Sequence, residues 1–168
     1  MFRDLYHELL KCMIYVPSRK EISPTNGLDL DEKTALEHFE GLDYRQALNL
    51  FRENFDYYID DLHWMGINAF LYYLKSLNAY LKETDFTDDP LDLFLTSKSI
   101  LMTFEIMFDR GYKEKISTNK DACDIQIFII LKLKNICDNY EQLVANDPIL
   151  PNFRKIDKLR QKWYQLLN

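Results

Sequence analysis

Three histidines, His7, His38 and His63, are the side chains of this 168-residue chain best suited to act as a general base or a metal ligand near neutral pH. None stands in an H-E-x-x-H motif, and Asp60-x-x-His63 is an aspartate variant of the Glu-x-x-His pair. A di-metal helical bundle needs such pairs on several helices. An enzyme or metal-binding bundle that uses His63 and nearby carboxylates is therefore one alternative. In the second alternative, Asp60, Asp61 and His63 lie at the solvent-exposed end of a helix or line a partner-binding face.

No motif for nucleophilic catalysis or phosphate binding occurs: the chain lacks G-x-S-x-G, G-x-G-x-x-G and Walker patterns. Cys12, Cys123 and Cys137 lack C-x-x-C spacing, and on one helix the last two would lie about 21 Å apart, too far for a disulfide. Buried reduced thiols are the simpler interpretation. We therefore expect a protein that is not an enzyme, with no catalytic residue, no cofactor and no metal.

The elements that must position any site are predicted to be helices. Only 4 Gly and 5 Pro occur, whereas sheets need many tight turns built from these residues. Aromatic residues are abundant, with 11 Tyr, 11 Phe and 2 Trp, which excludes a disordered chain. Apolar spacing and capping signals predict a single all-α domain over residues 1–168, a bundle of six or seven mostly antiparallel helices. The expected helices cover about 2–13, 31–40, 44–61, 67–81, 90–110, 119–146 and 153–166.

Two segments depart from this plain helical pattern. Residues 17–30 contain two Pro and an Asn-Gly pair, and we expect them to form the longest loop. The apolar run from Ile125 to Leu133 fits either a helix or a buried strand. If this run is helical, the apolar seam of that helix is expected to include Cys123, Ile127, Leu131 and Cys137.

Charge is distributed unevenly along the chain, which carries a formal net charge of −6. Residues 29–92 hold 15 acidic and five basic side chains, whereas residues 110–168 carry a net charge of +4. The acidic block repels nucleic acid and anionic lipid and favours a basic protein partner, although acid-rich faces also serve solubility alone. The basic cluster in residues 154–162 is interpreted as a solvated helix face.

Aromatic side chains are concentrated between residues 55 and 80 and cannot all face one core. Exposed tyrosines beside acids have the composition of a protein-binding face, and a thick aromatic core is the alternative. The residues predicted to bind a partner are Asp56, Tyr57, Asp60, Asp61, Trp64, Tyr72, Asp85, Asp88 and Asp89.

The stretch from Phe39 to Leu81 resembles an uncharacterised, all-helical bacterial family. The resemblance rests on Phe39-Glu-Gly-Leu-Asp-Tyr44 and on Ala69-Phe70-Leu71-Tyr72-Tyr73-Leu74, and Asp124-Ile-Gln-Ile-Phe128 is similar to that family's next helix. The Pro that usually follows Tyr-Tyr-Leu is replaced by Lys75. The family implies a helical fold and no known activity.

In general character, and through no motif, the chain also resembles the immunity proteins of polymorphic toxin and contact-dependent growth-inhibition systems. That resemblance implies a basic toxin domain, such as a nuclease, as the partner. No apolar run is long enough to span a membrane and no signal-peptide core is present, so we expect a cytoplasmic protein without membrane or direct nucleic-acid contact. We expect a monomer or a weak homo-oligomer.

Overall fold

The computed structural model describes residues 15–86, 89–146 and 149–166, and over these residues the chain is helical without any strand. Nine helices occur there, more than the six or seven expected. They are α2 (Arg19–Ile22), α3 (Leu30–Phe39), α4 (Tyr44–Leu62), α5 (Ile67–Glu83), α6 (Pro90–Asp109), α7 (Lys113–Ser117), α8 (Lys120–Asp138), α9 (Tyr140–Asn146) and α10 (Phe153–Leu166). The all-α prediction is confirmed, and the helix expected at 2–13 lies outside the described residues.

Capping side chains define the helix starts that the sequence indicated. The Asp43 carboxylate accepts hydrogen bonds from the backbone N–H groups of Arg45 and Gln46, and Gln46 Oε1 accepts one from the Asp43 N–H. Asp89 caps α6 ahead of Pro90, and Asn119 accepts a hydrogen bond from the first turn of α8. Each cap satisfies backbone donors that a helix leaves unpaired.

Three local predictions differ from the structure, and the alternative left open for residues 125–133 is decided. The expected loop at 17–30 contains the one-turn helix α2, and the short helix α7 precedes α8. Residues 125–133 belong to helix α8 and not to a strand. The helix expected over 119–146 is divided, because α8 ends at Asp138 and α9 begins at Tyr140.

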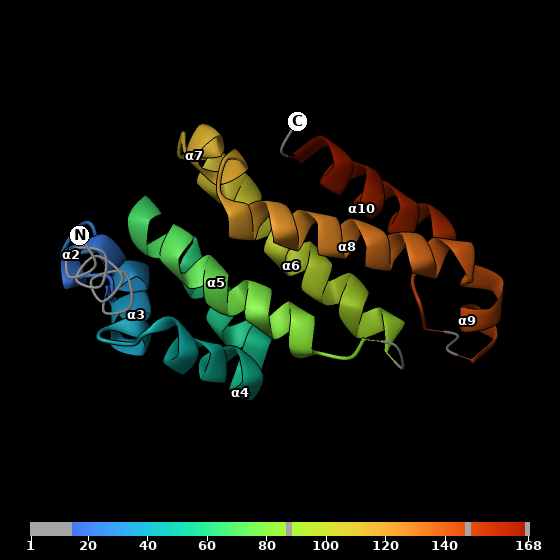
Figure 1. Cartoon of the computed structure of the whole chain (residues 1–168), viewed down its shortest axis with the longest axis horizontal. Coiled ribbons are helices and arrows are strands. Elements are labelled where there is room, and N and C mark those ends of the chain that lie inside the picture. Colours follow the sequence, from blue (N-terminus) through green and yellow to red (C-terminus); the bar gives the residue numbers. More distant parts are fainter. Residues whose placement is uncertain (1–14, 87–88, 147–148, 167–168) are drawn as a thin grey trace, which may run out of the picture.

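The long helices pack as an elongated bundle (Figure 1). Helix α4 packs against α5 and α6, α5 packs against α8, and α8 packs against α10. The small helices α2 and α3 cover one end of this bundle, where α3 contacts α4 and α2 contacts α5. None of the helices in the described ranges is long and apolar enough to cross a membrane.

The core runs the length of the bundle and is rich in aromatic rings. Its largest fully buried side chains include Trp163, Tyr73, Phe39, Phe51, Phe70 and Phe104. The α8 seam differs from the expected one: Ile125, Ile129 and Leu133 are buried, whereas Ile127 and Leu131 are 57% and 60% exposed. A helix flanked on two sides buries the stripe that faces both neighbours, which spacing alone does not identify.

Gly66 joins the α2–α3 end to the rest of the bundle. Its backbone N–H donates to the carbonyl oxygen of Glu21 at 3.0 Å. A Cβ atom at residue 66 would lie 2.7 Å from that same oxygen, so a side chain there requires the two backbone segments to move apart. This close backbone approach places α2, and with it α3, against the start of α5.

Candidate functional site

An acidic pocket lies between α3 and the C-terminal half of α4. Its volume is about 270 Å³, and its lining residues are Asp31, Thr34, Asp56, Tyr57, Asp60, Asp61 and Trp64. Five of the nine residues predicted to bind a partner therefore line one pocket. We call this site the acid–aromatic pocket.

Helix geometry explains how α4 contributes its part of the lining. Asp56 and Asp60 are four residues apart, as are Tyr57 and Asp61, and such residues lie on one helix face. Asn54 has non-helical backbone angles (φ −158°, ψ 88°), and its side-chain oxygen accepts a hydrogen bond from the Tyr57 N–H. The kink at Asn54 therefore starts a new helical segment just before the pocket residues.

Three carboxylates of the pocket, those of Asp31, Asp56 and Asp60, are exposed. None of the three forms an ion pair with a lysine or arginine among the described residues. Like charges held together without a counter-charge produce a negative potential that attracts a cation. The site is therefore electrostatically suited to a basic side chain.

Asp61 differs from the other acids predicted for this face, because it is only 5% exposed and already has a partner. Its Oδ2 atom lies 2.7 Å from Nδ1 of His38 on α3. Burial raises the pKa of Asp61, and the hydrogen bond and charge of His38 oppose that rise. This contact joins α3 to α4 beside the pocket, which Asp61 lines.

The other side of the His38 ring contacts two tyrosines. Tyr57 and Tyr58 have ring centroids 5.2 Å and 5.1 Å from that of His38. The Tyr57 hydroxyl lies 3.5 Å from His38 Nε2, at the outer limit for a hydrogen bond, so His38 does little to activate that hydroxyl as a nucleophile. The arrangement instead holds the Tyr57 ring, which is 54% exposed, in a fixed position.

His63 caps the C-terminus of α4 and is 7% exposed. Its Nδ1 atom is buried without a hydrogen-bond partner among the described residues. Burial lowers the pKa of His63, Asp60 and Asp31 oppose that change, and Arg110 adds to it. The buried His63 ring packs against Trp64, with centroids 5.0 Å apart. No cluster of three or more His, Cys, Asp or Glu able to hold a metal occurs in the described ranges.

Three of the other four residues predicted to bind a partner do not line the pocket. Tyr72 is buried, and its hydroxyl accepts a hydrogen bond from the backbone N–H of Tyr44. Asp85 is exposed in the connection between α5 and α6, where Asp89 caps α6. Asp88 lies outside the described residues.

Sequence reasoning missed the contribution of α3. Asp31, Thr34 and His38 are spaced three and four residues apart, so they share one helix face. The spacing shows that these residues share a face of α3. It does not indicate that this face packs against the α4 residues that line the pocket. Three residues of the site were therefore found only by the packing.

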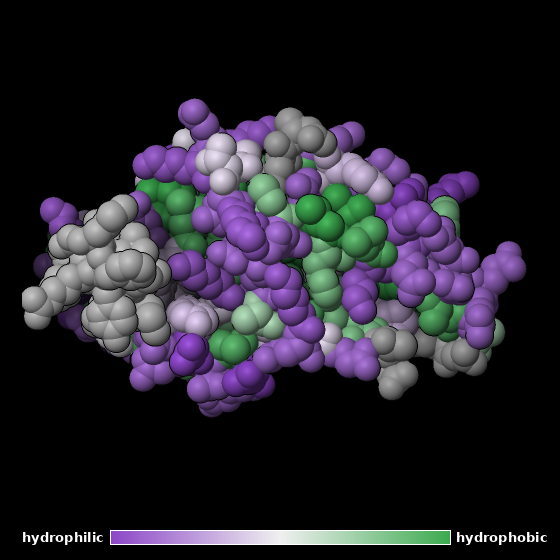
Figure 2. Space-filling model, viewed as in Figure 1, coloured by the Kyte–Doolittle hydropathy of each residue, from purple (hydrophilic) through white to green (hydrophobic). Residues whose placement is uncertain are grey.

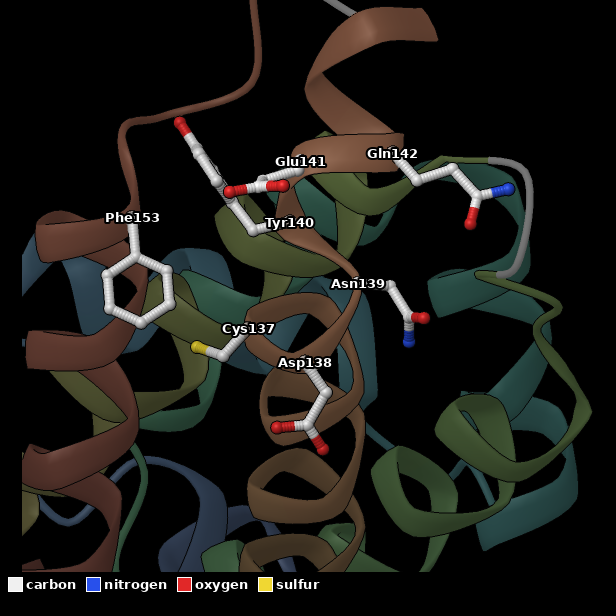
Figure 3. Close-up of a pocket in the computed structure, with 7 residues that line it drawn as sticks. All are labelled: Cys137, Asp138, Asn139, Tyr140, Glu141, Gln142 and Phe153. Carbon is white, nitrogen blue, oxygen red and sulfur yellow. The ribbon is translucent and has the colours of Figure 1, made fainter.

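A larger pocket of about 650 Å³ lies at the opposite end, where α8, α9 and α10 meet (Figure 3). The Cys137 thiol points toward the Phe153 ring there, and burial raises the pKa of that thiol. A thiol that resists ionisation is a poor nucleophile and metal ligand. Asp138 forms an ion pair with Lys134 one turn earlier on α8.

Comparison of the chain with protein-family models, with curated proteins and with solved structures finds no match in any of the three. The function must therefore be inferred from the pocket itself.

Proposed function

We propose that this protein is a protein-binding module and that the acid–aromatic pocket receives a basic side chain of its partner. The observation that carries the proposal is one pocket that combines two exposed aromatic rings with three exposed carboxylates, none paired with a cation in the described part of the chain. Trp64 is 38% exposed and Tyr57 is 54% exposed. An arginine or lysine side chain there would gain both ion pairing and a cation–π contact.

The surroundings of the pocket support a macromolecular partner. Leu30 is 78% exposed and lies one helical turn before Thr34, which lines the pocket. Leu28, two residues earlier, is 88% exposed. Apolar anchors beside a charged pocket are typical of protein interfaces, in which a few large side chains provide most of the binding energy.

More specifically, we propose an immunity protein that neutralises a basic toxin domain, such as a nuclease. The support is the acidic block of residues 29–92, which contains all the acids of the pocket and carries a net charge of −10. Complementary charge accelerates association with a basic partner, an advantage for an inhibitor that must act before a toxin does.

The experiment is a growth-rescue assay in a bacterial host. The toxin candidate is the C-terminal domain of a secreted protein encoded immediately upstream of this gene. Wild-type protein should restore growth, and the Asp56→Asn/Asp60→Asn/Trp64→Ala variant should not. A matched control, Asp109→Asn/Glu114→Gln, neutralises two exposed acids on α6 and α7 and should rescue fully. Absence of such a gene, or failure of wild-type rescue, overturns the immunity function.

A further inference from the structure

Helix α8 displays a regular stripe on its solvent-exposed face. Ile127 and Leu131, the residues expected in the core, stand at its centre. Figure 2 shows a hydrophobic patch where Figure 1 places the middle of α8, with hydrophilic side chains around it. The stripe consists of Lys120, Asp124, Ile127, Leu131, Lys134 and Asp138. Five of the six are exposed, whereas the Asp124 side chain is 28% exposed and also pairs with Lys82 on α5.

The spacing of this stripe alternates between four and three residues along its whole length. Alternate members are seven residues apart, which is the heptad repeat of the seam by which two helices pack as a coiled coil. The charged members flank the apolar centre and are paired along the helix: Lys120 binds Asp124 at 2.9 Å, and Lys134 binds Asp138. We call these six residues the exposed α8 stripe.

The exposed α8 stripe is complementary to itself only when one copy is reversed. Counting from Ile129, Ile127 and Leu131 stand two residues to either side. Asp124 and Lys134 stand five residues away, and Lys120 and Asp138 stand nine away. In an antiparallel pair, residues equidistant from the centre face each other. Every cation of one helix then faces an anion of the other, and Ile127 faces Leu131. A parallel pair would place each charge against its own copy.

We propose that α8 binds α8 of a second copy of this chain, antiparallel, around a twofold axis at Ile129. An isologous interface requires one patch to complement itself, which the exposed α8 stripe does at all six positions. No such symmetry is needed to bind an unrelated protein. The 19 residues of α8 span about 28 Å, so the contact is at the small end of specific interfaces and the dimer is weak. The pocket on α3 and α4 remains free in this dimer.

The test is sedimentation velocity from micromolar to millimolar concentration with two charge-uniform variants. Lys120→Glu/Lys134→Glu makes the stripe acidic, and Asp124→Lys/Asp138→Lys makes it basic. Each alone should dimerise at least about tenfold more weakly than wild type, because every facing pair becomes repulsive. An equimolar mixture should recover dimers, since opposite stripes then meet in the proposed register. A monomeric wild type, or a mixture no more dimeric than its components, overturns the proposal.

Asp124 also contacts Lys82 and Asn78 on α5, so its replacement is checked for folding by circular dichroism. If the basic variant unfolds, Lys120→Glu is mixed with Asp138→Lys, which leaves Asp124 in place. Ile127→Asp should abolish the dimer, whereas Met102→Asp, at a 47% exposed site on α6, should leave it intact. Equal effects of these two variants contradict the assignment to α8.

Discussion

Asp61 and His38, which are 23 residues apart in the chain, are joined by a 2.7 Å contact between Oδ2 and Nδ1. The aspartate side chain is 8% exposed and the histidine side chain 21% exposed. A buried carboxylate needs such a partner, because its desolvation is costly. The pair thus connects the α3 wall of the acid–aromatic pocket to its α4 wall.

Removing one member of this pair should destabilise the fold more than removing both. His38→Leu leaves the Asp61 carboxylate buried without a partner, and we expect the free energy of unfolding to fall by about 1–3 kcal/mol. Adding Asp61→Leu should restore part of that loss. The measurement is urea unfolding of the wild type, both single variants and the double variant. Strictly additive effects would show that the two side chains are not coupled.

Burial of His63 should make the protein less stable in mild acid. Its pKa is lowered in the folded state from the ordinary value of 6.5, so below that pH the unfolded chain binds the proton more readily. Stability is therefore unaffected by this group above pH 6.5 and declines as the pH falls toward the folded-state pKa. His63→Phe, which keeps a ring against Trp64, should flatten the decline in urea midpoints between about pH 7 and 5. Parallel pH profiles for wild type and variant would refute this.

Gly66→Ala should destabilise the protein by about 1–3 kcal/mol, since a Cβ atom 2.7 Å from the Glu21 oxygen forces the backbones apart. Gly41→Ala is the matched control. Gly41 has φ +76°, but a Cβ atom there would meet no other atom within 4 Å, so the cost is backbone strain of about 1 kcal/mol. Thermal unfolding should rank Gly66→Ala as the less stable variant. The reverse order would show that the α2 contact yields easily.

The pocket should bind an isolated cationic side chain weakly and in a defined place. In two-dimensional ¹H–¹⁵N NMR, N-acetylarginine amide should shift the indole N–H signal of Trp64 and leave that of the fully buried Trp163 unchanged. Asp56→Asn/Asp60→Asn should reduce the shift at equal ligand concentration, and added salt should do the same. The uncharged analogue N-acetylcitrulline amide serves as the control ligand. Equal shifts from both ligands would exclude recognition of charge.

The sequence by itself determined where most helices begin and which α4 residues form one stripe. Asp43, Asp89 and Asn119 cap helices through bonds to backbone groups within three residues, so these signals are local. Asp56, Tyr57, Asp60 and Asp61 share a face of α4 because of helical periodicity alone, whereas Trp64 lies in the turn after that helix. Four predicted site residues could therefore be placed together without any tertiary information.

Only the tertiary structure decided what that stripe meets and which side of α8 is buried. His38 contacts Asp61 because α3 packs across α4. Tyr72 does not lie on the predicted binding face, because its hydroxyl accepts a hydrogen bond from the Tyr44 backbone. On α8, two apolar stripes compete, and the neighbours α5 and α10 bury the one that contains Ile129. Periodicity identifies the faces of a helix, but burial depends on contacts between segments far apart in sequence. Ile127 and Leu131 are exposed because α5 and α10 pack against the other apolar stripe of α8.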